Sequence, residues 1–235
     1  MAQNNPIFLA LDLDSADRAL ELAKSCSPYV GGFKVGPRLG LKYGEDFIAR
    51  LSELGQVFVD FKFYDIPNTM LSSLRASFAA GASYATIHAQ CGLETLKQIR
   101  ELEQELGSVR PFTVLAVTVL TSYSKSNRPS LWRELSITDQ VRLLVEDVKE
   151  SGLHGVVCSA QEVSKLKEQF PEGFFVTPGI RKPDDAGGDQ KRIMGPKEAV
   201  DAGSDLLVVG RPIVDAQDPV AAAKAYYETL FGGAE

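Results

Sequence analysis

Residues 60–69 read Asp-Phe-Lys-Phe-Tyr-Asp-Ile-Pro-Asn-Thr and follow the apolar run Val-Phe-Val at 57–59. Because strand residues two apart share a face, we expect Asp60 and Lys62 to point one way and the phenylalanines beside them the other. Pro67 should stop the strand, with Asp65 just before it. The stretch therefore predicts three charged groups at one end of a buried strand, and burying charge is costly unless the charges are paired or used.

Two interpretations of this stretch are open. An isolated Asp-x-Lys pair is typical of a structural ion pair inside a barrel. Ion-pair networks shift the pKa values of charged groups even where those groups have no function. The second acid, Asp65, and the Ile-Pro-Asn-Thr tail that follows it favour a catalytic array instead.

Short apolar runs alternate with amphipathic segments along the chain, a pattern typical of repeated strand–helix units. We expect strands at 7–13, 31–36, 56–63, 83–89, 111–120, 155–160, 174–180 and 205–209. We expect helices at 16–25, 44–54, 69–80, 93–106, 138–151, 162–169, 196–202 and 219–231. Eight such units predict a (β/α)₈ TIM barrel. No linker or shift in composition divides the chain, so we expect residues 1–235 to form a single domain.

Charged and polar residues gather where the expected strands end, which is the edge that holds the active site in such barrels. They are Asp12, Lys34, Asp60, Lys62, Thr121, Arg181, Gly210 and Arg211. Charges without a function would fall mainly on the helices. This convergence predicts an enzyme.

The loops after the seventh and eighth strands favour a phosphate site, a common feature of barrels at this position. Arg181, Gln190 and Arg211 supply side-chain donors, and the glycines at 187, 188 and 210 allow backbone N–H groups to approach a ligand. An arginine binds phosphate through two parallel bonds, which lysine cannot do. The alternative is a solvated basic loop.

The composition excludes several classes of protein. The chain has 235 residues, 44% of them hydrophobic, and a net charge of −6, so the surface does not predict nucleic-acid binding. Three scattered cysteines and two histidines favour neither a disulfide framework nor a metal site. No apolar run is long enough to cross a membrane and residues 1–6 are polar, so we expect a cytoplasmic protein. No cofactor motif follows a strand.

The stretch at 60–69 resembles the signature of the orotidine 5′-phosphate decarboxylase family in its short bacterial form. Further segments resemble the same family in the same order: Leu11–Asp14, Phe33–Gly36, Leu120–Ser122, Thr177–Arg181, Gly187–Arg192 and Val209–Ile213. One departure is the segment Met194-Gly195-Pro196, where relatives often have threonine before that proline. It weakens a helix cap and affects no expected catalytic residue.

The resemblance implies decarboxylation of orotidine 5′-monophosphate to UMP without a cofactor or a metal. It makes Lys62 the group that stabilises the carbanion and protonates C6, and Asp60 the carboxylate beside that of the substrate. Lys34 would link Asp60 to the ribose, and Asp12 would accept a bond from a ribose hydroxyl.

The resemblance also implies a homodimer with shared active sites. Asp65 and Thr69 would reach into the active site of the neighbouring subunit. Ile66 would belong to the same set of substrate-binding residues. Thr121 would lie on the loop that closes over the base. The phosphate would be held by Arg181, Gln190, Arg211 and the backbone of Gly210.

Three alternatives remain open. A sugar-phosphate synthase or decarboxylase of the same superfamily would use a divalent metal, although the tail at 66–69 is unlike it. A Schiff-base aldolase would use Lys62 as a nucleophile, but two nearby aspartates favour its protonated form. A nucleotide-binding barrel without catalysis would not need the intact array of charges.

Overall fold

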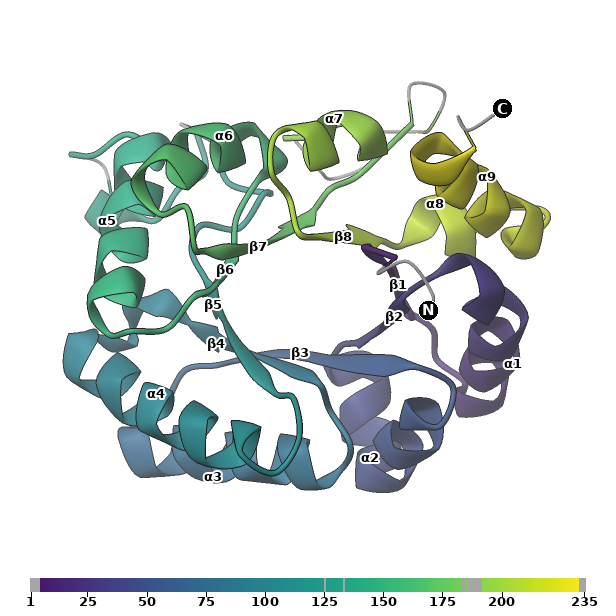
Figure 1. Ribbon diagram of the computed structural model, residues 1–235, viewed down its shortest axis with the longest axis horizontal. Helices are drawn as coiled ribbons and strands as arrows, with labels where there is room; N and C mark the ends of the chain where they lie inside the picture. The colour runs from purple at the N-terminus through teal and green to yellow at the C-terminus, as the bar shows by residue number, and fades with distance from the viewer. Residues whose placement is uncertain (1–4, 125, 133, 183–184, 186–191, 233–235) are drawn as a thin grey trace.

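Eight parallel strands close into a barrel in the computed structural model, which describes residues 5–124, 126–132, 134–182, 185 and 192–232 (Figure 1). Each strand pairs with the next along the chain, and β1 pairs with β8 to complete the ring. The strands are β1 (Ile7–Ala10), β2 (Gly32–Val35), β3 (Gln56–Phe63), β4 (Tyr84–His88), β5 (Thr113–Val117), β6 (Gly155–Val157), β7 (Phe174–Pro178) and β8 (Leu206–Val209). The predicted TIM-barrel fold is confirmed.

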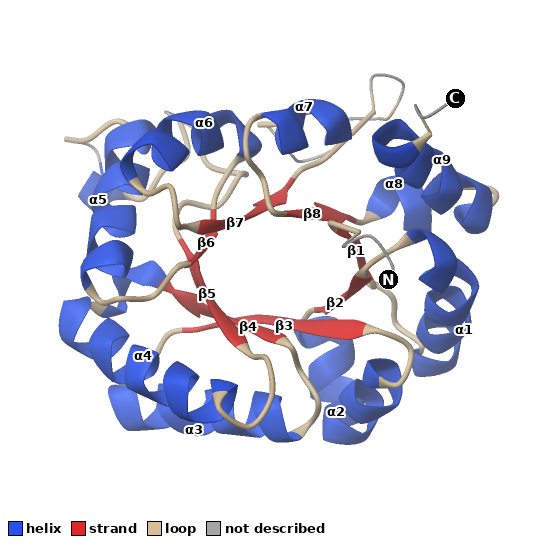
Figure 2. Ribbon diagram, in the orientation of Figure 1, coloured by secondary structure: helices blue, strands red, loops and turns tan. Residues whose placement is uncertain are grey.

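Helices form a ring outside the strands, as Figure 2 shows. The α-helices are α1 (Ala16–Cys26), α2 (Pro37–Ser52), α3 (Pro67–Ala79), α4 (Leu93–Gly107), α5 (Ile137–Glu150), α6 (Ala160–Gln169), α7 (Pro196–Asp201), α8 (Arg211–Val214) and α9 (Pro219–Phe231). Short 3₁₀ helices are η1 (Ser27–Tyr29), η2 (Ala89–Cys91) and η3 (Ser130–Trp132). None of the described helices is both long enough and apolar enough to cross a bilayer.

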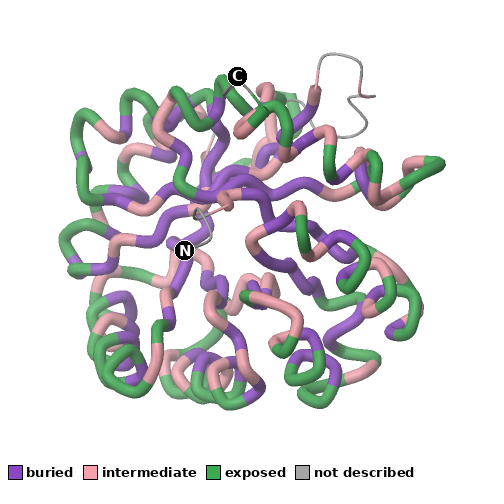
Figure 3. The backbone as a smooth tube through the Cα atoms, turned by 45° about the vertical axis from the view of Figure 1, so that its right-hand side comes forward, coloured by how far each residue is buried: buried purple, intermediate pink, exposed green. Residues whose placement is uncertain are grey.

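Two hydrophobic layers hold the barrel together. The larger layer lies between strands and helices and includes Leu9, Phe33 and Leu74. The smaller layer fills the barrel interior with Phe8, Phe58 and other strand side chains. Figure 3 accordingly shows buried backbone through the strands and exposed backbone on the outer side of the helices. A filled interior leaves the ends of the barrel as the places where a ligand can bind.

The second helix starts earlier than the sequence indicates. We expected it at 44–54, but α2 begins at Pro37 and contains a kink at Gly44, whose φ is +66°. The first turns pack closely against β3, because a Cβ atom at Gly40 would lie 2.0 Å from the Phe61 ring. Two glycines and a proline concealed this helical segment, since both residue types are poor helix formers in isolation. The short helix α8 was also missed, because four residues leave no periodicity to detect.

Strand β3 carries two extra residues opposite β4. Val59 pairs with Ala85, whereas Phe63 pairs with Ile87, so four steps along β3 match two along β4. An insertion of two residues preserves the alternation of side chains, because that alternation has a period of two. The phenylalanine rings at 61 and 63 therefore still meet, with centroids 5.8 Å apart, in the layer beneath the helices.

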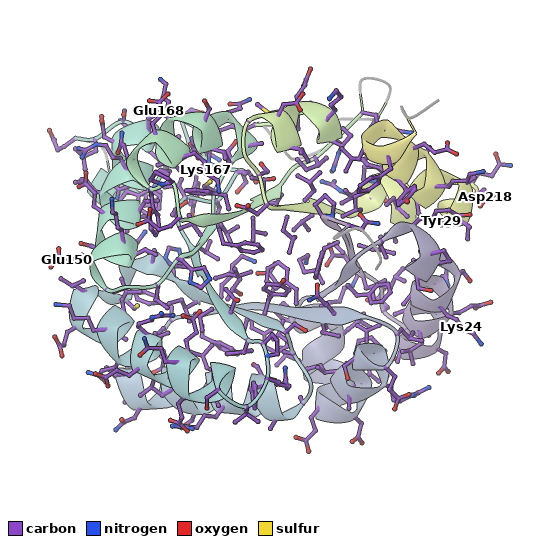
Figure 4. All side chains as sticks on the ribbon, in the orientation of Figure 1. Lys24, Tyr29, Glu150, Lys167, Glu168 and Asp218 are labelled. Carbon is purple, nitrogen blue, oxygen red and sulfur yellow. The ribbon has the colours of Figure 1, made fainter. Side chains whose placement is uncertain are left out.

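Charged side chains outside the barrel mouth lie mainly on the helical ring. Figure 4 shows Lys24, Glu150 and Glu168 at the periphery of the molecule. The charged side chains at the strand ends therefore form a group separate from the solvent-exposed charged side chains of the helices.

Candidate active site

A cavity of about 350 Å³ opens where the strands end. Its polar lining combines the positions that the sequence placed at the strand ends: Asp12, Lys34, Asp60, Lys62, Thr121, Arg181, Gly210 and Arg211, with Ser122 beside them. The volume falls within the range of small-molecule sites. The structure thus brings residues from six strands or the loops after them into one pocket.

Asp60 lies between two lysines at the mouth of the barrel. Its Oδ1 atom is 2.8 Å from Nζ of Lys62, and its Oδ2 atom is 3.4 Å from Nζ of Lys34. Lys34 also lies 3.4 Å from Oδ1 of Asp12. The array therefore alternates in charge, from Asp12 through Lys34 and Asp60 to Lys62. Lys62 is the more exposed lysine, with 38% of its side chain accessible against 11% for Lys34.

The Asp60 carboxylate is held in its ionised form. Burial alone would raise its pKa, but the positive charges of Lys34 and Lys62 and hydrogen bonds from Lys62 and Thr86 outweigh burial and lower it. A carboxylate with a lowered pKa beside two ammonium groups gives the pocket a preorganised field where charge can develop in a reaction.

Thr86, on β4, completes this array and was missed in the sequence. Its side chain is fully buried, accepts the backbone N–H of Lys62 at 2.8 Å and donates to Oδ1 of Asp60 at 3.1 Å. A threonine within an apolar strand gives no sequence signal of its own, because β-branched residues are common in strands for packing alone.

Asp65, Ile66 and Thr69 do not line the cavity within this chain. All three are exposed, and the Asp65 carboxylate accepts the backbone N–H of Ile66 at 2.7 Å. We expected three charged groups to gather at the strand end; only two of them, Asp60 and Lys62, meet there. The physical reason is that the chain turns outward into α3 after Phe63, which carries residue 65 away from the pocket.

Two arginines line the cavity after β7 and β8. Arg181 is buried after β7 and donates to the backbone carbonyl of Ile180 at 2.8 Å, and Arg211 begins α8 directly after Gly210. A Cβ atom at Gly210 would lie 3.8 Å from Oδ2 of Asp12, which puts this loop next to the charged array. Gln190 and the glycines at 187 and 188 lie outside the described residues.

Apolar side chains form the rest of the wall, and the sequence did not single them out. They include Ala10, Phe58, Val117, Val119, Val157, Cys158, Pro178 and Val208. Such residues read as ordinary core from sequence, since nothing in their type separates a pocket wall from packing. They surround the charged array with a low-dielectric wall, which strengthens every electrostatic interaction inside it.

His88, at the end of β4, is a neighbour of the array. Burial, and then the charge of Lys62, lower the pKa of His88. Its Nδ1 atom accepts the backbone N–H of Gln90 at 3.4 Å, and its ring lies 5.7 Å from that of Tyr64. These contacts give His88 a packing role at the base of the loop.

Arg192 connects two loops of the site. It forms a buried ion pair with Glu162 of α6 and donates to the carbonyls of Val119 and Leu120 at 3.2 and 3.3 Å. The bonded carbonyls directly precede Thr121, so Arg192 holds the loop that lines the cavity. The interaction spans more than 70 residues, and sequence alone does not reveal such a pairing.

A sequence model described as "Orotidine 5'-phosphate decarboxylase / HUMPS family" matches residues 5–226. The chain belongs to this family. The match includes every strand and every position of the charged array, so the predicted resemblance to orotidine 5′-phosphate decarboxylases is confirmed.

Curated relatives within the family cover nearly all of the chain. An orotidine 5′-phosphate decarboxylase of Pseudoalteromonas translucida is 43% identical over 221 residues, which is 93% of this chain and 94% of that protein. One of Novosphingobium aromaticivorans is 38% identical over 228 residues, covering 97% of this chain and 100% of the relative. Both relatives carry the name of a decarboxylase.

Solved structures agree with the sequence relatives. The crystal structure of orotidine 5′-phosphate decarboxylase from Lactobacillus acidophilus superimposes with a TM-score of 0.80 at 35% identity, over 95% of this chain and 98% of that one. Among the residues of our chain that the structure describes, no group of three or more His, Cys, Asp and Glu side chains is arranged to hold a metal ion.

Proposed function

We propose that this protein decarboxylates orotidine 5′-monophosphate to UMP in pyrimidine biosynthesis. The observation that carries the proposal is that the alternating array Asp12–Lys34–Asp60–Lys62 lines one cavity together with Arg181 and Arg211. A charged array and two arginines in one partly apolar pocket suit a ligand that has both an anionic phosphate and a reacting ring. The names of the curated relatives support the same substrate.

The phosphate of the substrate would bind on the arginine side. Arg211 and Arg181 supply charged donors, the Gly210 backbone allows close approach, and Gln190 completes the set expected from the family. The ribose would then lie over Asp12 and Lys34, and the base would extend toward Lys62 under the loop that carries Thr121. Binding energy at the phosphate, remote from the reacting carbon, would help to order this loop and the charged groups.

The reaction breaks the bond between C6 of the pyrimidine and its carboxylate. The electron pair remains on C6, carbon dioxide leaves, and the Nζ atom of Lys62 donates the proton that C6 needs to give UMP. Lys62 suits both steps, because an ammonium group stabilises the developing negative charge and then acts as the acid. Its contact with Asp60 keeps that ammonium in place while the cavity is empty.

Asp60 would face the carboxylate of the bound substrate. Its lowered pKa keeps it negative at neutral pH, so it holds the two lysines and opposes a second carboxylate nearby. Departure of carbon dioxide removes that repulsion, and the lysines remain held for proton transfer. Asp60 thereby acts on the lysines and on the substrate at once.

A homodimer with shared sites explains the exposed residues after β3. Asp65, Ile66 and Thr69 lie outside the cavity of their own chain, and Ile66 is 67% exposed beside Tyr64 at 64%. An exposed apolar pair next to an exposed carboxylate suits an interface with a second copy of the chain. Asp65 would then complete the charged array of the neighbouring site beside the neighbour's Lys62.

The experiment that tests the proposed function measures loss of orotidylate absorbance after adding protein dialysed against EDTA. We expect stoichiometric conversion to UMP, identified by chromatography, at the same rate with and without EDTA. Turnover that needs added Mg²⁺ would favour the sugar-phosphate synthase alternative, and borohydride trapping of a Lys62 adduct would favour the aldolase. Absence of UMP would refute the proposal.

A further inference from the structure

The backbone at Lys62 has an unusual conformation. Its φ is +52°, and among the described residues other than glycine it is the sole one with a positive φ. A residue with a Cβ atom rarely adopts such a conformation and keeps it only where surrounding contacts impose it. The conformation falls within the two-residue insertion of β3, where regular pairing with β4 is interrupted.

The hydroxyl of Thr86 supplies the contact that the interrupted ladder lacks. It accepts the Lys62 backbone N–H at 2.8 Å, in place of a backbone carbonyl of the neighbouring strand (β3 and β4 in Figure 1). Without this acceptor the N–H group would be left unsatisfied in a partly buried position, which costs free energy.

The same hydroxyl also fixes the carboxylate. Its proton points to Oδ1 of Asp60 at 3.1 Å, and this oxygen also accepts the bond from Nζ of Lys62 at 2.8 Å. The three residues thus form a closed ring of hydrogen bonds, in which one end of Lys62 is held through its N–H and the other through its ammonium. Thr86 is fully buried and β-branched, so its rotamer is restricted.

We propose that Thr86 is a positioning residue that sets the separation and direction of the Lys62 ammonium and the Asp60 carboxylate. Its methyl group serves packing, and its hydroxyl serves the array. This inference rests on the proposed function only in that Lys62 is the group that acts on the substrate. Thr86 itself is not among the residues that line the cavity.

The test compares two variants of Thr86 with a matched control. Thr86→Val keeps the shape and removes the hydroxyl, whereas Thr86→Ser keeps the hydroxyl and removes the methyl group. Thr177→Val is the control, because Thr177 is equally buried, on β7, and bonds to Ser204 and to the Leu206 carbonyl outside the cavity. If Thr86→Val does not fold, Thr86→Ala takes its place with the same expectation.

Steady-state kinetics should separate positioning from simple loss of stability. We expect Thr86→Val to lower kcat about 10- to 100-fold with KM within about three-fold, since misplacement of a reacting group affects turnover more than binding. Thr86→Ser and Thr177→Val should stay within about three-fold of the unmodified protein in both constants. Unchanged kcat in Thr86→Val, or an equal loss in Thr86→Ser, would overturn the proposal.

A crystal structure of Thr86→Val provides a readout that needs no substrate. We expect Lys62 to leave the positive-φ region and its contact with Asp60 to lengthen. Retention of both would overturn the proposal. If the unmodified protein fails to convert orotidylate, the proposed function fails, yet this structural comparison still decides whether Thr86 sets the geometry of Lys62.

Discussion

Lys62 and Asp60 are joined at the barrel mouth by a 2.8 Å contact between Nζ and Oδ1. Because Lys34 holds the other oxygen of the same carboxylate, the Lys62 ammonium has a defined position before any ligand binds. In the proposed function Lys34 and Asp60 would place the array and Lys62 would react, so we expect different results from changing each.

Replacing Lys62 with alanine should remove nearly all turnover and leave nucleotide binding measurable. The variant loses both the charge that stabilises the carbanion and the proton that C6 receives, whereas the phosphate contacts are untouched. Turnover of orotidylate and calorimetric binding of UMP check the two parts. Lys224→Ala is the control, since that lysine lies on the surface in a pair with Glu228. Near-normal turnover in Lys62→Ala would refute the assigned mechanism.

Replacing Arg211 with alanine should mainly weaken phosphate capture. Loss of a charged contact from the pocket should cost about 2–4 kcal/mol in kcat/KM, mostly through KM. Arg75→Ala serves as the control, because its pair with Glu105 is exposed on the helical ring. The decisive measurement repeats the assay with a substrate analogue that lacks the phosphate: Arg211→Ala should not change its kcat/KM. Unaltered constants for orotidylate itself would remove Arg211 from the site.

Mixing two inactive variants should restore activity if Asp65 acts across a dimer. In a heterodimer of Lys62→Ala and Asp65→Ala chains, one site carries both changes and the other carries neither. Random exchange of subunits should therefore recover roughly a quarter of the activity of the unmodified protein. Each variant alone and an unexchanged mixture are the controls. If exchanged mixtures stay inactive while heterodimers form, Asp65 serves its own chain.

Asp60 should make the free energy of unfolding fall more steeply as the pH is lowered into the acid range. Its pKa is lowered in the folded protein, so its contribution to the free energy of unfolding is present above the unfolded-state value near 3.8 and is lost as the pH falls through the folded-state value. In that window the slope contributed is at most about 1.4 kcal/mol per pH unit. Urea unfolding between pH 5 and 2.5 should show a shallower decline for Asp60→Asn. Parallel curves would contradict the expectation.

Breaking the Arg192–Glu162 pair should destabilise the fold. Burial raises the pKa of Glu162, against the opposing charge of Arg192, so removing the arginine leaves a poorly solvated carboxyl group. Arg192→Met should cost about 3–5 kcal/mol in the free energy of unfolding, and adding Glu162→Gln should recover part of that loss. Denaturant titrations of both variants check this. An additive or larger loss in the double variant would show that the pair is not coupled.

Much of the site was visible in the sequence because its residues occupy the ends of strands. Asp12, Lys34, Asp60, Lys62 and Arg211 each follow or complete an apolar run, and a parallel barrel brings such ends together whatever its detailed register. The apolar wall was not visible, since residues such as Val157 look the same whether they pack or line a pocket.

The sequence by itself determined the barrel, the mouth at which charge gathers and the family, because alternation and motif spacing are local properties of the chain. The tertiary structure decided which residues meet. Thr86 lies opposite the two-residue insertion of β3 at Lys62, and Arg192 pairs with Glu162. The tertiary structure also turned Asp65 away from the cavity of its own chain. These pairings depend on which residues of different strands and loops lie side by side. Register and backbone direction set that, and neither is encoded in the periodicity of one segment.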